Sequence, residues 1–93
     1  MNIIICGAGR VGCSIAKQLS ALSHSITIID KSSEEIQKIT DSMDVKGIVG
    51  TATFPSVLEK AGGKEADMII AVTRNDEVNM TVCQVAHSIF ITS

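Results

Sequence analysis

Apolar and polar positions along the chain alternate between two spacings. Four short apolar runs, typical of strands buried on both faces, occupy residues 2–6, 25–30, 44–49 and 66–73. A helix over residues 10–22 is predicted between the first two runs, because its apolar side chains recur at helical spacing: Val11, Ile15, Leu19 and Leu22.

The remaining helices are predicted from their end residues and from the same helical spacing. Ser32 and Glu35 have the spacing of a capping box at the start of the second helix. Pro55 stands in the first turn of a short third helix, and Asn75 or Asp76 can cap the last one. The expected inner faces are Ile36, Ile39 and Met43 in the second helix and Val78, Val82, Val85, Ala86 and Ile89 in the last.

Strands that alternate with helices predict an α/β fold. We expect a Rossmann-like, doubly wound parallel sheet with strand order 3-2-1-4 and right-handed crossovers. Residues 1–93 are interpreted as a single domain and as a fragment of a longer protein, because this fold normally adds at least one strand after the fourth helix. A bare fourth strand would be an apolar edge, so self-association is expected.

A glycine pattern, GxGxxG, follows the first predicted strand. Gly7 permits the tight turn into the helix, Gly9 lets the backbone approach a pyrophosphate, and Gly12 lets the helix pack closely on the sheet. Asp30 ends the second strand, where its carboxylate can accept hydrogen bonds from a ribose diol. The pattern predicts an adenine-dinucleotide site at the switch between strands 1 and 4. The alternative is that the glycines serve packing alone.

Composition excludes several classes of partner. The net charge is −2 with interspersed signs, which argues against a nucleic-acid or anionic-membrane surface. No apolar stretch approaches the ~20 residues of a membrane span. The first strand follows Met1 at once and leaves no room for a signal peptide, so a cytoplasmic protein is expected.

Structural roles are predicted for most other chemically distinctive side chains. Cysteines at positions 6, 13 and 83 lack metal-ligand spacing and are expected to be buried, reduced thiols, while Met68 and Met80 are expected to fill the core. Asp76 and Glu77 suit a helix start. The histidines at positions 24 and 87 have no nearby acidic or thiol partner, so neither catalysis nor metal binding is predicted.

Two segments beyond the glycine pattern are similar to a known family. Residues 49–62 read VGTATFPSVLEKAG, and residues 66–86 read ADMIIAVTRNDEVNMTVCQVA. With GAGRVG at residues 7–12 and with Asp30, they resemble the N-terminal lobe of the RCK (KTN) domain of the peripheral Trk potassium-uptake subunits, over essentially the whole chain. The resemblance implies a nucleotide-binding regulatory domain that is not an enzyme.

The same resemblance implies a ligand, partners and a location. Such domains bind NAD(H), and some relatives bind ATP or ADP. They assemble as homo-oligomers, dimers and rings, beneath a membrane-embedded potassium-translocating subunit at the inner face of the cell membrane. Ligand exchange changes the shape of the ring and gates the pore. The full domain continues into further strands and a second regulatory lobe.

The ligand contacts implied by the resemblance fall in loops that each follow a strand. They are Gly7, Ala8, Gly9, Arg10, Val11 and Gly12 around the pyrophosphate, Asp30 at the ribose with Lys31 beside it, Gly50, Thr51 and Ala52 at the adenine, and Val72, Thr73 and Arg74 near the second half of the dinucleotide. A solvated role for Arg10 remains an alternative. Thr51 departs from the Asp or Asn frequent in relatives, which bears on the choice between NAD and ATP.

Two other protein classes fit the glycine pattern. The cofactor domain of an NAD-dependent oxidoreductase would need an acid near the nicotinamide, and a methyltransferase ligand has no pyrophosphate for the glycines to hold. Asp30 also favours NAD(H) over NADP(H). At ~4 Å its repulsion of a 2′-phosphate is about 1 kcal/mol in water and about 4 at an effective dielectric of 20, so NADP(H) should bind weaker by roughly one to three powers of ten.

Overall fold

The structure is a computed structural model that describes residues 1–90, with side chains described for residues 1–86. The elements are β1 (Asn2–Cys6), α1 (Arg10–Ala21), β2 (Ser25–Asp30), α2 (Ser33–Ser42), β3 (Lys46–Val49), α3 (Pro55–Lys60), the 3-10 turn η1 (Gly63–Glu65), β4 (Met68–Ala71) and α4 (Asp76–Phe90). Strands alternate with helices as predicted. The turn η1 was not predicted; Gly62 enters it at a φ of 90°.

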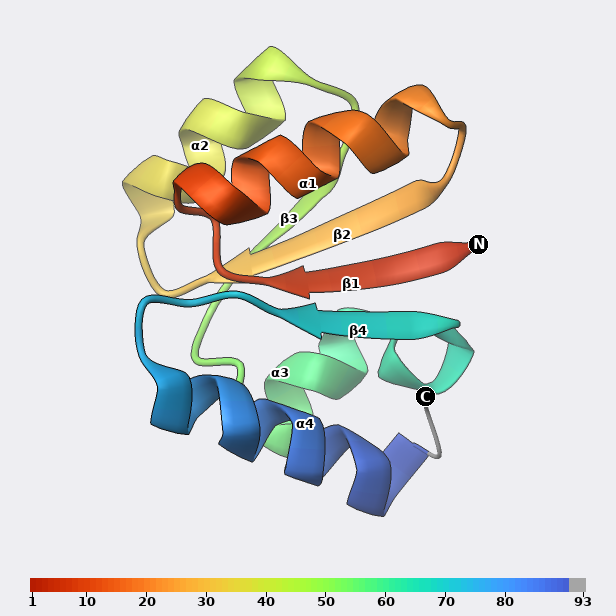
Figure 1. Cartoon of the computed structure of the whole chain (residues 1–93), viewed down its shortest axis with the longest axis vertical. Helices are drawn as coiled ribbons and strands as arrows, with labels where there is room; N and C mark the ends of the chain where they lie inside the picture. The colour runs from red at the N-terminus through yellow and green to blue at the C-terminus, as the bar shows by residue number, and fades with distance from the viewer. Residues whose placement is uncertain (91–93) are drawn as a thin grey trace.

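The strands form one parallel sheet in the order β3-β2-β1-β4, which confirms the predicted topology (Figure 1). Ile3 of β1 is in register with Ile26 of β2 on one side and with Met68 of β4 on the other. The chain therefore moves outward from β1 to β3 and then returns to the opposite side of β1. All four strands point the same way, so their carboxyl ends meet at one edge of the sheet.

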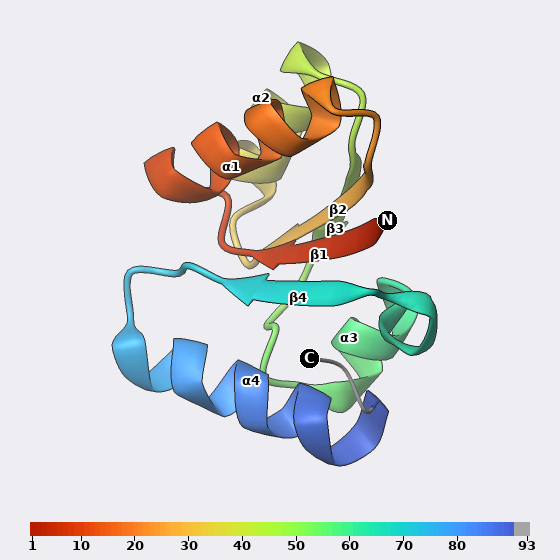
Figure 2. The same cartoon turned by 45° about the vertical axis from the view of Figure 1, so that its right-hand side comes forward.

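Helices cover both faces of the sheet and make three layers (Figures 1 and 2). Ile3 and Ile5 of β1 point into one apolar core, beneath α1 and α2. Ile4 and Cys6 point into the other, where Leu58 of α3 and Val82 and Ala86 of α4 pack against them. This alternation explains why the strands read as continuous apolar runs, since each face of the sheet is buried.

The buried face of α1 differs from the predicted one. Val11 is 58% exposed and Leu22 is 67% exposed, whereas Gly12 and Ala16 are buried. Small residues face the sheet because the helix runs very close to the turn before it: a Cβ on Gly12 would lie 1.8 Å from the Gly7 carbonyl oxygen. Ile15 and Leu19 pack at the margin of the core, so only part of the predicted stripe faces inward.

The predicted helix ends are largely confirmed. The Ser32 Oγ accepts a hydrogen bond from the Glu35 N–H at 3.3 Å, and Pro55 is the first residue of α3. Of the two candidate caps of α4, Asn75 acts as one, because its Oδ1 accepts from the Val78 N–H at 3.0 Å.

Sulfur-containing side chains are less buried than predicted. Cys6 is buried, but Cys13 is half-buried and Cys83 is exposed. Met80 is 71% exposed and Met68 is 36% exposed, so the prediction that both fill the core is wrong. The inner face of α4 is centred on buried valine and alanine, which turns Met80 and Cys83 outward, and Met68 begins an edge strand. Among the helices described, none is both long and apolar enough to cross a membrane.

Candidate functional site

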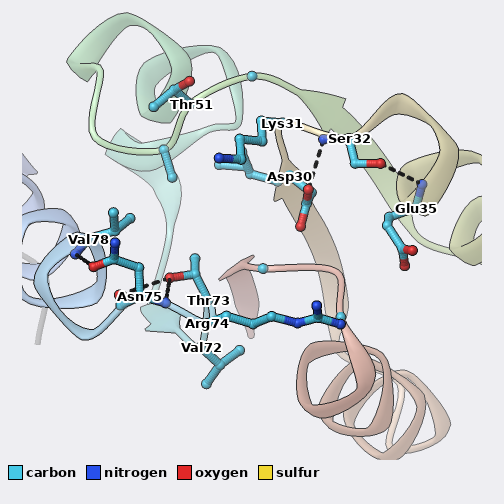
Figure 3. Close-up of a pocket in the computed structure, with 15 residues that line it drawn as sticks. Asp30, Lys31, Ser32, Glu35, Thr51, Val72, Thr73, Arg74, Asn75 and Val78 are labelled. Atoms are coloured by element: carbon cyan, nitrogen blue, oxygen red, sulfur yellow. Dashed lines mark hydrogen bonds between the residues drawn. The ribbon is translucent and has the colours of Figure 1, made fainter.

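A pocket with a volume of about 380 Å³ lies at the carboxyl ends of the strands (Figure 3). Each strand contributes the loop that follows it. The lining residues are Gly7, Gly9, Ile29, Asp30, Lys31, Ser32, Glu35, Gly50, Thr51, Ala52, Val72, Thr73, Arg74, Asn75 and Val78. The pocket therefore occupies the edge of the sheet where the strand order reverses, which is where open α/β sheets bind ligands.

Most of the site residues expected from the sequence come together here. Those that line the pocket are Gly7, Gly9, Asp30, Lys31, Gly50, Thr51, Ala52, Val72, Thr73 and Arg74. Ala8, Arg10, Val11 and Gly12 are not among the lining residues: Ala8 and Gly12 are buried, and the side chains of Arg10 and Val11 are exposed. The additional lining residues are Ile29, Ser32, Glu35, Asn75 and Val78.

The three glycines of the pattern have different surroundings. Gly7 has a φ of 118°, and a Cβ there would lie 2.9 Å from the Val72 carbonyl carbon and oxygen. Position 12 requires glycine because any side chain there would collide with the Gly7 carbonyl. At Gly9, φ is −75° and a Cβ would meet nothing within 4 Å. Packing thus explains Gly7 and Gly12, whereas Gly9 leaves open space that belongs to the pocket.

The start of α1 is available to an anion. Gly9 is its N-cap, makes no side-chain cap, and no acidic residue stands in the first turn. In contrast, Ser32 caps α2 and Asn75 caps α4, and both helices carry acidic residues in the first turn. A helix start without a side-chain cap presents unpaired N–H groups and a partial positive charge, which favour phosphate or carboxylate groups.

Asp30 holds the turn between β1 and α1. Its Oδ2 accepts from the Ala8 N–H at 2.9 Å, and its Oδ1 accepts from the Ser32 N–H at 2.8 Å (the latter is drawn in Figure 3). Each carboxylate oxygen has a second acceptor position, which leaves room for a ribose hydroxyl. Only the ribose role of Asp30 could be predicted from the sequence, because the partner N–H groups approach the carboxylate only in the folded chain.

Glu35 lines the pocket because Asp30 takes its usual hydrogen-bond partner. In a full capping box, the acidic side chain bonds back to the N–H of the cap residue. Here Asp30 accepts that Ser32 N–H, and the Glu35 side chain lines the pocket instead. The capping-box spacing was the available signal, but it indicated a purely local role.

The loop between β4 and α4 is fixed by Asn79. Its Oδ1 accepts from the Thr73 N–H at 2.8 Å and from the Thr73 Oγ1 at 2.6 Å, and its Nδ2 donates to the Thr73 carbonyl at 3.0 Å. Thr73 Oγ1 also lies 3.1 Å from the Asn75 carbonyl oxygen and 3.2 Å from the Asn75 nitrogen. Asn79 was not predicted as a functional residue from the sequence.

Charges around the pocket balance. The lining residues include two acids, Asp30 and Glu35, and two bases, Lys31 and Arg74. A phosphate group would therefore be met chiefly by backbone N–H groups at the start of α1, with Lys31 and Arg74 as flanking cations. In the described part of the chain, no group of three or more His, Cys, Asp or Glu side chains could hold a metal ion. The arrangement suits binding of a phosphorylated ligand.

Known proteins share both sequence and fold with this chain. The chain is similar to the Trk system potassium uptake protein TrkA of Azorhizobium caulinodans, with 51% identity over 90 residues that cover 97% of the chain and 20% of that protein. The corresponding TrkA of Halomonas elongata is 44% identical over 92 residues, covering 99% of the chain and 20% of that protein. The chain thus spans about one fifth of the length of these relatives.

Among solved structures, the chain is similar to the Kef CTD of Shewanella denitrificans in its AMP-bound form. The TM-score is 0.86 at 27% identity, and the match covers 98% of this chain and 54% of that one. The sequence model of the TrkA-N domain matches residues 3–92. These matches confirm the resemblance to the Trk subunits found from the sequence. The chain belongs to the TrkA-N domain family.

Proposed function

We propose that this chain is the nucleotide-binding domain of a peripheral regulatory subunit for potassium uptake. Its ligand is an adenine nucleotide, NAD(H) or else ATP or ADP, which is bound without turnover. The observation that carries the proposal is the start of α1, which has no side-chain cap and borders the pocket at Gly9. Family membership and the TrkA relatives support the regulatory role.

The pocket suggests how a dinucleotide would lie. The pyrophosphate is placed over Gly9 and the first N–H groups of α1, and the adenosine ribose on Asp30. The adenine lies towards the loop after β3, which contributes Thr51 to the pocket. The second nucleoside lies towards the loop after β4. The volume of about 380 Å³ falls within the range of small-molecule sites, about 300–1,000 Å³, and the AMP held by the Kef relative supports an adenine nucleotide.

The proposed partner is a membrane-embedded, potassium-translocating subunit. The whole protein is longer than this chain, forms a homo-oligomer and lies at the cytoplasmic face of the membrane. Nucleotide exchange in the pocket changes the assembly and so controls the pore. The names of the TrkA relatives support a partner in potassium uptake, and their lengths support a longer protein.

Calorimetric titration and thermal unfolding test the ligand. A nucleotide that binds only the folded chain at 100 times its Kd adds about 2.7 kcal/mol to the free energy of unfolding. We expect NAD+, NADH, ADP or ATP to raise Tm, and NADPH to act much less than NADH. Gly9→Ala should abolish the rise without lowering the Tm of the free chain, because its methyl group fills only pocket space. No response to any of these nucleotides would overturn the proposal.

The transport role needs the full-length protein. We expect Gly9→Ala in that protein to change potassium uptake in cells that depend on it, at an unchanged level of folded protein. Uptake that is unaffected by Gly9→Ala, in a variant that no longer binds nucleotide, would contradict nucleotide control of transport.

A further inference from the structure

Asn79 makes three side-chain hydrogen bonds, all to one residue of a neighbouring loop. It lies in the second turn of α4, half-buried, and bonds the N–H, the carbonyl and the hydroxyl of Thr73. Asparagine is a poor residue inside a helix, because its amide competes with the backbone for hydrogen bonds. Here the amide copies the pairing of one strand with another and holds the loop to the helix.

The loop held by Asn79 forms one end of the pocket. Val72, Thr73 and Arg74 line the pocket from this side. The opposite end is held separately, by the bonds of Asp30 to Ala8 and Ser32. The two ends of the pocket are therefore positioned by different side chains, and disturbing one need not disturb the other.

The position of this loop also limits the space beside the glycine turn. Gly7 packs so closely on Val72 that a Cβ would lie 2.9 Å from its carbonyl group. Any outward shift of Thr73 would open this contact and widen the pocket on the β4 side. The affinity for a ligand that occupies only the β2 and β3 side of the pocket would not change.

We propose that Asn79, acting through Thr73, is the positioning residue for the second nucleoside of a bound dinucleotide. It sets the affinity for NAD+ and leaves the affinity for AMP nearly unchanged. This inference rests on the proposed function, because it requires a dinucleotide to span the pocket from Asp30 to the β4–α4 loop. Asn79 contacts the loop and is not itself among the residues that line the pocket.

The test is a pair of titrations, NAD+ and AMP, on the wild-type chain and on three variants. Asn79→Asp keeps the acceptor for the Thr73 N–H but sets an oxygen against the Thr73 carbonyl, and Asn79→Ala removes all three bonds. We expect both to weaken NAD+ binding by about tenfold or more and to change AMP binding by less than about twofold. Thr81→Ala is the matched control: its hydroxyl bonds to the Glu77 carbonyl within α4, and neither affinity should change.

Each result has a distinct meaning. Equal weakening of NAD+ and AMP would show a general structural role and overturn the inference, as would unchanged NAD+ binding. A wild-type chain that binds neither NAD+ nor AMP would overturn the inference without any variant. The proposed function itself would be rejected only if NADH, ADP and ATP also failed to bind. If the Asn79 variants do not fold, hydrogen exchange of the wild-type Thr73 N–H decides: NAD+ should slow it more than AMP does, and equal slowing would contradict the inference.

Discussion

The Asp30 carboxylate and the Ala8 N–H are joined by a hydrogen bond of 2.9 Å, across the end of the sheet from β2 to the turn after β1. Ala8 is fully buried, so its N–H has little access to water. The residue at the position expected for a ribose contact therefore also holds the shape of the glycine turn. Binding and local stability are coupled through one side chain.

Asp30→Ala should lower both stability and nucleotide affinity. The substitution leaves the Ala8 N–H buried without its acceptor and frees the Ser32 N–H. An unpaired buried donor costs about 1–3 kcal/mol, so we expect the free energy of unfolding in urea to fall by about that amount. Asp67→Ala is the control, because that carboxylate accepts the Asn2 N–H at the far end of the sheet; it should leave nucleotide binding intact. Unchanged stability in Asp30→Ala would contradict the role of this bond.

The glycines at positions 9 and 12 should separate binding from folding. Gly12→Ala forces a methyl group against the Gly7 carbonyl, and overpacking of this kind costs about 1–3 kcal/mol. Gly9→Ala meets no neighbour at an ordinary φ, so we expect its stability to change by less than about 0.5 kcal/mol while nucleotide binding is lost. Urea unfolding and calorimetry on the same samples measure both quantities. A strongly destabilised Gly9→Ala would mean that this glycine serves packing after all.

Cys6 should make the fold sensitive to alkaline pH. Burial, with a smaller effect of the nearby Cys83 thiol, raises the pKa of Cys6 from 9.0 to about 12. Above pH 9 the unfolded chain loses this proton while the folded chain keeps it, so the free energy of unfolding falls as pH rises towards 12. The slope for one group is at most about 1.4 kcal/mol per pH unit. Below pH 9 this group contributes no pH dependence.

Cys6→Ala isolates this effect, because the two proteins are identical at every other position. Urea unfolding between pH 8 and 11 should give a steeper decline for the wild type than for Cys6→Ala, whatever their difference at pH 8. Parallel curves would show that the thiol ionises equally in the folded and unfolded chains.

Ser23→Gly should stabilise the chain. Ser23 follows α1 with a φ of 67°, a left-handed conformation that is costly for a residue with a Cβ and easy for glycine. We expect a gain of about 0.5–1 kcal/mol, seen as a rise in Tm of roughly 2–8 °C. Ser20→Gly lies inside α1, where glycine has a lower helix propensity than serine, and should lower Tm instead. A fall in Tm for both variants would contradict the assigned strain.

The order and type of the elements follow from local pattern. Continuous apolar runs are stable only between two covering layers, and the segments of helical spacing between them supply those layers. Chain connectivity and the parallel sheet then leave few strand orders, which is why 3-2-1-4 could be predicted. The glycine pattern and Asp30 predicted the edge of the sheet at which the pocket lies, because the carboxyl ends of parallel strands meet there.

Side-chain roles that depend on contacts between different loops and helices could not be predicted from the local sequence pattern. The spacing of Val11 and Leu22 indicates a buried face. In the structure the close approach of Gly12 to the Gly7 carbonyl leaves Val11 exposed, and Leu22 lies beyond α1 as its C-cap. The spacing of Ser32 and Glu35 suggests a capping box, but the Asp30 carboxylate, at the end of β2, accepts the Ser32 N–H in place of Glu35. Nothing in the local sequence distinguishes Asn79 from other polar residues of a helix, and its bonds to Thr73 exist only once α4 packs beside that loop. Periodicity records which residues repeat along one element, whereas a contact between elements depends on distances that exist only after the layers have packed.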